Sequence, residues 1–494
     1  EYSNWHIPFQ EYPDGSYALF RDGEKYCEIV SDPAASRTIW YYKNEENFVA
    51  STSQIAIIKF IEGFEFDERV IPWMLSTGTL GPSYSWDRRI GKVPPNSSVI
   101  LHKHNWFLEK RISKILFEVH KGSKKLHEKK LKEKLFSTIN SMKVNYSDWV
   151  LPLSGGYDSR VILCAAKTNY NKDIKTITWG VESSLNDSKS DAFIAQKLAK
   201  ELKVPHKFYP IELSVESAEK IFNRFITNGE GRIDHIQAYV DGFKMWKVLH
   251  EDNVQGIIRG DEGFGWKKVS SIFTARHSVG LRLCSDYINL KRFQKNGFLQ
   301  QEIPAYLRKA EHESVNQWRD RLYHEFRVPT YLAALSDLKL SYVEQVTPLL
   351  SLNILDQVRS QPDRLRTDKY LFKKIVNSLS PKIPYAKRES TVSFSSFLEQ
   401  EEVASLLRQE IKNNLENDIF PKDFLNHVLE NIKISNKTKK KNRAFYDLSV
   451  IKSKLPSFIK NIVIDNISST SLIDYNRLGF RIYIVLRMHN IFKK

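Results

Sequence analysis

A short apolar strand followed at once by a double-glycine loop is the feature that most constrains the fold of this chain. Residues 149–153 are apolar, and after them come Ser154-Gly155-Gly156-Tyr157-Asp158-Ser159 and an apolar stretch with helical spacing. Two adjacent glycines let backbone amides turn toward one anion, and the helix directs its positive end at the same place. Asp158 adds a hard oxygen ligand for Mg²⁺, while Ser154 and Ser159 add hydroxyl donors. The segment predicts a pyrophosphate-binding loop at the carboxyl end of a strand.

From residue 137 onward, strand-like segments alternate with helical ones. The strand-like segments are residues 149–153, 175–179, 208–211 and 254–258. Residues 188–202 carry alanine and leucine at helical spacing. This alternation predicts an α/β fold in which crossover helices join parallel strands into a doubly wound sheet. After about residue 280 we expect the chain to be mainly helical.

The first 108 residues have a different pattern of short strands and turns. Turn signals at Asp14-Gly15 and Asp22-Gly23 flank strand-like segments at residues 16–20 and 26–30, and further strands are expected at 38–42 and 48–51. We therefore predict a layered β-rich domain over residues 1–118 and an α/β domain over residues 119–494. An amphipathic, lysine-rich helix with Leu126, Leu131 and Leu135 is expected at the link.

Three motifs in the larger part resemble one enzyme family. The double-glycine loop resembles the SGGxDS loop of N-type ATP pyrophosphatases. The string Gly260-Asp261-Glu262-Gly263-Phe264-Gly265-Trp266 resembles the SDELFGGY segment of asparagine synthetases. Residues 368–374 and then 385–389 resemble the helix and the following segment that carries the catalytic lysine of that family. The chain thus resembles a divergent asparagine synthetase, and its first 51 residues resemble the last third of a class II glutamine amidotransferase domain of the Ntn type.

The resemblance implies ATP and Mg²⁺ as cofactors and suggests a role for each motif. Asp158 and Asp261 would hold the metal, and Lys387 would neutralise charge that develops on the α-phosphate. Residues 228–235 would face a carboxylate substrate, with Arg232 as its anchor and Glu262 as a second substrate-binding residue. The residues expected to contact ATP are Leu153, Ser154, Gly155, Gly156, Tyr157, Asp158, Ser159, Thr178, Trp179, Gly180 and Gly260.

The chain departs from the family pattern at several positions. The cysteine nucleophile that begins the glutaminase domain has no counterpart, so we expect either a trimmed chain or a domain that serves as a scaffold. Ile258 and Arg259 stand where the family has an acidic SGEG stretch, and Arg160 replaces a small residue after the loop. These changes put aspartate in doubt as the substrate. They leave open a small-molecule, sugar-acid or peptide carboxylate, with ammonia or an amine as the nitrogen donor.

The predicted reaction is activation of a carboxylate as an acyl-adenylate, with release of pyrophosphate, followed by amide formation and release of AMP. One alternative is a tRNA-modifying adenylating enzyme, which would share the loop and suit the net charge of +17. No aromatic platform accompanies the lysine-rich segments and the three cysteines form no CxxC pair, so we do not expect nucleic acid as a partner. A catalytically silent scaffold is the other alternative.

Composition limits the class of protein further. No run of eighteen apolar residues occurs, and the first residues form no charged-then-apolar secretion signal, so we expect a cytoplasmic protein without a membrane span. A homodimer is compatible with the sequence. The basic stretch at residues 433–443 lacks apolar spacing and is expected to be a flexible loop.

Overall fold

A parallel sheet forms the centre of the larger part of the chain. The computed structural model describes residues 6–10, 12–169, 173–211, 214, 216–294, 297–391, 394–435 and 471–493, and within them a five-stranded sheet has the order β10-β9-β8-β11-β12. Its strands are β8 (Trp149–Pro152), β9 (Lys175–Gly180), β10 (His206–Pro210), β11 (Gly256–Ile258) and β12 (Glu344–Val346). All neighbouring strands are parallel, so their carboxyl ends meet at one edge.

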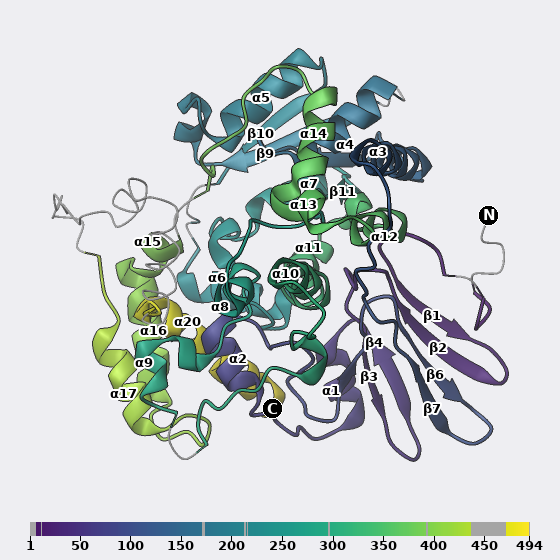
Figure 1. Cartoon of the computed structure of the whole chain (residues 1–494). Helices are drawn as coiled ribbons and strands as arrows, with labels where there is room; N and C mark the ends of the chain where they lie inside the picture. The colour runs from purple at the N-terminus through teal and green to yellow at the C-terminus, as the bar shows by residue number, and fades with distance from the viewer. Residues whose placement is uncertain are drawn as a thin grey trace.

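Helices cover both faces of this sheet, which lies at the top of the molecule in Figure 1. Side chains alternate between the faces along a strand. Val150 and Ile257 belong to an apolar cluster with α6 (Ala218–Gly229), α7 (Lys244–Glu251) and α11 (Ala333–Leu340). Leu151 and Ile258 belong to a second cluster with α3 (Lys124–Ser141), α4 (Asp158–Cys164), α5 (Asp191–Glu201) and α14 (Tyr370–Leu379). The predicted doubly wound α/β fold is confirmed.

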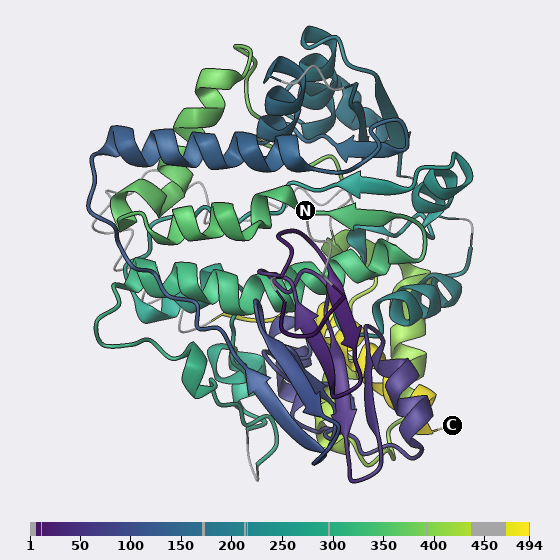
Figure 2. The ribbon, with the colours of Figure 1, turned by 90° about the vertical axis from the view of Figure 1, so that its right-hand side faces the viewer.

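The front part of the chain forms antiparallel sheets below the parallel one, as Figures 1 and 2 show. In the described residues, the sheets have the orders β1-β2-β6-β7 and β4-β3-β5. The strands are β1 (Ala18–Asp22), β2 (Tyr26–Ser31), β3 (Trp40–Lys43), β4 (Phe48–Ser51), β5 (Gly91–Lys92), β6 (Ser98–His102) and β7 (Phe107–Arg111). The strands predicted near residues 16, 26, 38 and 48 are present as β1 to β4. Helices α1 (Gln54–Ile61) and α2 (Val70–Thr77) follow β4.

Helices from the end of the described chain pack against the front part. Met74 of α2, Phe222 of α6 and Phe480 of α20 (Tyr475–Lys493) lie in one apolar cluster. Arg481 of α20 also donates a hydrogen bond of 2.7 Å to the carbonyl of Leu75. This cluster is continuous across the predicted boundary at residues 118 and 119, and that boundary stays a prediction.

The stretch after residue 280 is mainly helical, as predicted, apart from β12. Helices beyond those already given are α8 (Ile272–Ser278), α9 (Ile288–Lys291), α10 (Val315–Leu322), α12 (Leu352–Arg359), α13 (Asp363–Arg366), α15 (Phe394–Leu398), α16 (Glu401–Asn413) and α17 (Lys422–Asn431). A π-helical segment, Tyr323–Leu332, connects α10 to α11. Among the described residues, no helix is both long enough and apolar enough to span a bilayer.

The two lysine-rich regions differ in what the structure describes. Helix α3 starts after Ser123, whose hydroxyl accepts from the amide of Leu126, and it buries Leu131 and Leu135 as predicted. Leu126 lies in the first turn and is 41% exposed, so it is not part of the buried face. The predicted flexible loop at residues 433–443 lies outside the described residues from position 436 onward.

Candidate active site

A cavity of about 430 Å³ opens where the carboxyl ends of β8, β9 and β11 meet. Its walls are the loop after β8, the end of β9, the loop after β11, a turn before α7 and a short segment before α15. The lining residues are Pro152, Leu153, Ser154, Asp158, Ser159, Thr178, Trp179, Asp191, His235, Gln237, Ala238, Arg259, Gly260, Asp261, Glu389, Ser390 and Thr391. The carboxyl edge of the sheet therefore holds a pocket at the place where such sheets bind ligands.

The loop after β8 is folded so that its amides point at anions or hydroxyls. The amide of Ser154 donates to the hydroxyl of Ser159 at 3.0 Å, and the amide of Gly156 donates to the hydroxyl of Ser154 at 3.2 Å. The amide of Gly155 donates to a carboxylate oxygen of Asp191 at 3.0 Å. The loop thus already binds one negatively charged oxygen through its backbone, which is the behaviour expected of an anion-binding loop.

Glycine at position 155 is required by a close approach. A Cβ atom there would lie 2.4 Å from the Cβ of Ala386, so the side chain of Ala386 packs directly on the backbone of the loop. The amide of Ala386 also donates to the carbonyl of Gly155 at 3.0 Å. The loop and the segment carrying Lys387 are therefore in direct contact.

Asp158 lies at the start of α4 and is held by a lysine that sequence reasoning did not single out. The ammonium of Lys369 lies 3.0 Å and 3.1 Å from the carboxylate oxygens of Asp158 and 2.8 Å from Oε1 of Glu262. Burial raises the pKa of Asp158, and the nearby Glu262 and Asp261 raise it further, against the opposing effect of Lys369. Burial lowers the pKa of Lys369, but Glu262 and Asp158 more than offset this and keep the lysine charged.

The loop after β11 brings a second carboxylate to the same cavity. A Cβ atom on Gly260 would lie 2.9 Å from the amide nitrogen of Ser159, so only glycine allows this loop to lie against the double-glycine loop. Asp261 follows directly and pairs with Arg259, whose Nη2 lies 3.2 Å from Oδ1. The pKa of Arg259 is raised chiefly by the charge of Asp261. Gly260, Asp261 and Arg259 all line the cavity.

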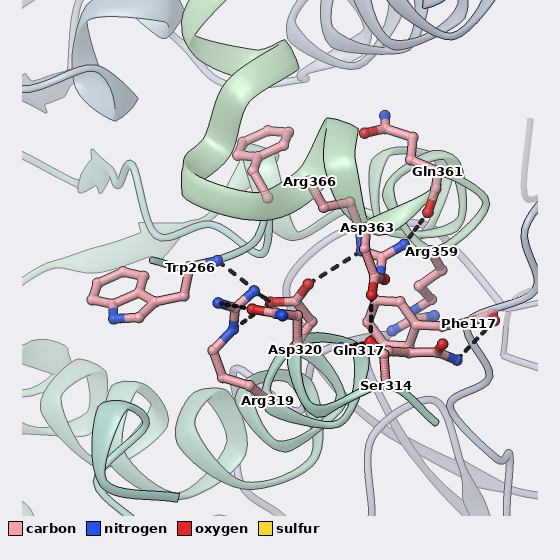
Figure 3. Close-up of polar contacts among 12 residues, drawn as sticks. Phe117, Trp266, Ser314, Gln317, Arg319, Asp320, Arg359, Gln361, Asp363 and Arg366 are labelled. Atoms are coloured by element: carbon pink, nitrogen blue, oxygen red, sulfur yellow. Dashed lines mark hydrogen bonds and ion pairs between the residues drawn. The ribbon is translucent and has the colours of Figure 1, made fainter. Parts of the chain in front are cut away.

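A buried ion cluster centred on Asp320 supports these loops, as Figure 3 shows. Asp320 pairs with Arg319 at 2.6 Å and with Arg366 at 3.2 Å, and it accepts a 3.4 Å hydrogen bond from the amide of Trp266. Arg319 and Arg366 are fully buried, and Arg366 also reaches the carbonyl of Gln361 and the carboxylate of Asp363. The cluster therefore joins the end of the loop after β11 to the turn that carries Lys369.

Arg160 holds the segment that carries Lys387 against the loop. Its guanidinium donates to the carbonyls of Ile383 and Pro384, each at 2.9 Å, and lies 3.9 Å from the ring centre of Tyr385. The Tyr385 ring stacks on Tyr157 with centroids 3.8 Å apart. Tyr157 therefore packs against this segment and is not part of the cavity lining.

Lys387 itself lies at the surface. Its side chain is exposed and is not among the residues that line the cavity, while its amide donates to the carbonyl of Lys189 at 2.8 Å. Glu389, Ser390 and Thr391, which follow it, do line the cavity. The structure therefore places the backbone near Lys387 at the site without placing its ammonium there.

One wall of the cavity is formed by residues that precede α7 in the chain, among them a neutral histidine. His235 lines the cavity, and its Nδ1 lies 2.7 Å from the hydroxyl of Tyr331. Burial lowers the pKa of His235 to about 4, so its ring is neutral at pH 7. Gln237 and Ala238 also line the cavity, as do Thr178 and Trp179 of β9, which were predicted to contact ATP.

Arg232 does not reach the cavity. Its buried guanidinium pairs with Asp337 and donates to the hydroxyl of Thr38 at 2.6 Å, and it lies 5.3 Å from the ring centre of Trp40. The segment predicted to face the substrate reaches the cavity at its end, through His235, and not through Arg232. Glycine at position 180 is likewise outside the lining, because it packs against Ser390.

The family model described as asparagine synthase matches residues 148–448, which is more than half of the chain. The chain belongs to the asparagine synthase family. Membership in the asparagine synthase family makes it an ATP-using phosphate-loop enzyme, and the matched range begins at β8 and includes every wall of the cavity. No curated protein sequence matches the chain.

One solved structure gives a much weaker likeness. The chain is similar to a U34-tRNA thiolase, NcsA from Methanococcus maripaludis with its 4Fe–4S cluster, at 16% identity over 65% of this chain and 91% of that chain. The TM-score is 0.23, so this likeness carries no argument about the asparagine synthase-family site.

The carboxylates of this asparagine synthase-family chain fit a magnesium ion bound together with a nucleotide. Mg²⁺ in such sites takes one or two carboxylates, with phosphate oxygens and water as its other ligands. Asp158 and Asp261 line one cavity. Burial raises the pKa of Asp158, and repulsion from Glu262 and Asp261 raises it further. In the part of the chain that the structure describes, no three His, Cys, Asp or Glu side chains form a metal site by themselves. The nucleotide would therefore supply the remaining ligands.

Several lining residues were missed by sequence reasoning. They lie outside the recognised motifs, since only the double-glycine loop and the Gly260 to Trp266 segment carry a local signal. The missed lining residues are Pro152, Asp191, Gln237, Ala238, Arg259, Glu389, Ser390 and Thr391. Arg259 had been noted only as a departure from the family pattern, and its charge in that loop was the available signal.

Proposed function

We propose that this chain is an ATP-dependent amide ligase that forms an acyl-adenylate. The observation that carries the proposal is the meeting, in one cavity, of an anion-binding loop and two carboxylates, Asp158 at the start of α4 and Asp261 in the loop after β11. An enzyme that transfers an adenylyl group needs both, because the leaving pyrophosphate must be bound and its charge neutralised. The substrate carboxylate would attack the α-phosphorus and release pyrophosphate. Ammonia or an amine would then attack the acyl carbon, releasing AMP and a proton.

Each wall of the cavity would have one part in this reaction. The amides of the double-glycine loop would bind the pyrophosphate portion, and Thr178 and Trp179 would lie along the nucleoside. Asp158 and Asp261 would hold Mg²⁺, which neutralises phosphate charge when bound. Glu262, which is 4% exposed in its side chain and pairs with Lys369, would support Asp158 and not contact the substrate directly.

The acyl substrate would bind at the wall formed by His235, Gln237 and Arg259. These side chains offer a guanidinium, an amide and a neutral imidazole, which are suited to a carboxylate or to hydroxyl groups. Arg232 is committed to Asp337 and Thr38, so this wall replaces it as the proposed anchor. A sugar acid or another polar carboxylate fits such a wall better than an apolar one.

Isotope exchange between ATP and pyrophosphate tests the adenylation step. Purified protein would be incubated with Mg·ATP, labelled pyrophosphate and, one at a time, aspartate, glutamate, glucuronate, galacturonate and succinate. We expect acid-dependent exchange in the wild type and its loss in Asp158→Asn and Asp261→Asn. Asp173→Asn is the matched control, because the side chain of Asp173 is 99% exposed.

The outcomes separate the proposed ligase from its alternatives. Exchange that survives in Asp158→Asn or Asp261→Asn would remove that residue from the site. Pyrophosphate release that depends on added tRNA, with no response to any acid, would indicate a tRNA-modifying enzyme. Failure of the wild type to bind ATP at all would indicate a scaffold.

A further inference from the structure

Lys369 occupies an unusual place for a lysine. Its side chain is only 16% exposed, and its ammonium contacts both oxygens of Asp158 and one oxygen of Glu262 within 3.1 Å. Its charge also lies 5.7 Å from the ring centre of Trp266. A single ammonium is thus shared by the carboxylate assigned to the metal and by a second, almost fully buried carboxylate.

The backbone is strained at this position. Asp368 and Lys369 have φ values of 58° and 54°, so two consecutive residues other than glycine are in the left-handed region. Such a conformation persists only where the surroundings impose it, and it is concentrated at functional sites. Here the amide of Asp368 donates to the carbonyl of Trp266 at 2.7 Å, and the buried Arg366 holds the turn just before it. The fold therefore directs the Lys369 side chain at Asp158 against a local preference.

The ammonium stands where a metal ion would have to bind. A cation at Asp158 needs at least one of its oxygens, and both now accept hydrogen bonds from Lys369. Two like charges cannot share this carboxylate closely without strong repulsion. When a metal ion and a nucleotide bind, the ammonium therefore needs another negatively charged partner. The phosphates of the nucleotide would supply one.

We propose that Lys369 is a nucleotide-binding residue that substitutes for the metal ion in the nucleotide-free protein and passes to the pyrophosphate portion when Mg·ATP binds. The inference rests on the ATP site of the proposed function. In the empty site the ammonium holds Asp158 and Glu262 together in place of the cation. In the loaded site it adds a positive charge to the pyrophosphate that leaves.

Two binding measurements test the inference without any need for the acyl substrate. Binding of Mn²⁺ alone would be followed by electron paramagnetic resonance, and binding of α,β-methylene ATP with Mg²⁺ would be followed by calorimetry. We compare the wild type with Lys369→Met, which removes the charge. Lys374→Met is the matched control, because Lys374 lies on α14, the helix that directly follows Lys369, and pairs with Glu128 without lining the cavity.

The two measurements should change in opposite directions. In Lys369→Met, Mn²⁺ alone should bind roughly tenfold more tightly or better, because a competing charge at hydrogen-bond distance is gone. The nucleotide analogue should bind roughly tenfold more weakly, because a charge-assisted contact to phosphate is lost. Lys374→Met should leave both affinities unchanged. Loss of a residue that only stabilises the fold would not strengthen Mn²⁺ binding while weakening nucleotide binding.

Three results would overturn the inference. If Mn²⁺ binds no more tightly to Lys369→Met than to the wild type, the ammonium does not compete with a metal. If the nucleotide analogue keeps its wild-type affinity, the ammonium does not pass to the phosphates, although the proposed ATP site itself would stand. If the wild type does not bind the analogue, the proposed function fails and this inference fails with it. Lys369→Gln, which keeps a hydrogen-bond donor without the charge, replaces Lys369→Met if the latter does not fold, with the same expected directions.

Discussion

Replacement of Arg160 by methionine should release the segment that carries Lys387 from the phosphate loop. The guanidinium is fully buried and donates to two carbonyls at 2.9 Å, those of Ile383 and Pro384. Hydrogen bonds from a charged donor contribute about 1.5–3 kcal/mol each. The contact with the ring of Tyr385 at 3.9 Å adds about 1 kcal/mol. These contributions are not additive, and methionine still fills much of the volume. We therefore expect the free energy that holds the segment against the loop to fall by about 3 kcal/mol.

A loss of that size raises the detached population of the segment roughly a hundredfold, since each 1.4 kcal/mol is a factor of about ten. Detachment would free the backbone next to Lys387 and Arg388, whose amides now donate to the carbonyl of Lys189 at 2.8 Å and 3.1 Å. Trypsin cleaves after both residues. The assay is therefore the rate of tryptic cleavage at these two bonds, followed by mass spectrometry under native conditions.

Two further variants complete this experiment. Arg160→Lys should recover only part of the protection, because one ammonium cannot reproduce the planar fork that reaches two carbonyls and stacks on a ring. Arg364→Met is the control, because Arg364 is exposed and its removal should leave the cleavage rate unchanged. A rate in Arg160→Met within about threefold of the wild type would show that this arginine does not hold the segment, and the reasoning would be refuted.

Three other predictions concern the site and its support. The family resemblance assigns catalysis to Lys387, although its exposed side chain does not line the cavity. If that assignment holds, Lys387→Ala lowers turnover in steady-state kinetics by roughly a hundred- to a thousandfold with little change in ATP affinity, whereas exposed Lys382→Ala does not. Unchanged turnover, or a loss confined to ATP affinity, would remove Lys387 from catalysis. Gly260→Ala should abolish nucleotide binding by calorimetry, because its Cβ would meet backbone at 2.9 Å, whereas Gly23→Ala, with 3.5 Å to its nearest atom, should bind normally. Burial lowers the pKa of His324 to about 3, so this histidine takes up a proton at a higher pH in the unfolded chain than in the folded one, and the free energy of unfolding falls as pH drops from about 6.5 towards 3. In urea denaturation, His324→Gln should therefore lose less stability between pH 7 and pH 4.5 than the wild type does. An equal loss in both proteins would contradict this.

Much of the larger part could be predicted because its signals are local. The double-glycine loop, the strand before it and the helix after it appear where the sequence placed them, and the family is the one that the motifs resembled. Strand β12 was missed because Glu344, Gln345 and Val346 carry no apolar pattern and are strand only through pairing with β11. Hydrophobic periodicity reveals a strand only where side chains are buried on one face in a regular pattern. A three-residue edge strand with a polar sequence has no such pattern.

The candidate site was harder to predict than the fold, and Lys369 shows why. Its neighbourhood was recognised as a helix, but the direction of its side chain depends on a left-handed turn at residues 368 and 369, which contains no glycine that would signal it. That turn is imposed by Arg366 and Trp266, which are distant from Asp158 in the sequence. Arg232 is the reverse case. Its charge suggested a substrate anchor, whereas in the structure its guanidinium binds Asp337 and Thr38, which come from other parts of the chain. The roles assigned to the other site residues stay predictions.

The packing of α2 against α20 sets an order of events during synthesis of this protein. Leu75 and Arg481 are hydrogen-bonded although 406 positions separate them, and the apolar cluster around them includes Trp86 and Phe480. A ribosome would therefore release the antiparallel sheets and α2 long before the helix that completes their core exists. Contacts of such separation form late and slowly. Until α20 emerges, the apolar face of α2 must stay exposed to solvent or be shielded by a chaperone, so we expect the nascent chain to be the state in which this protein is most prone to aggregate.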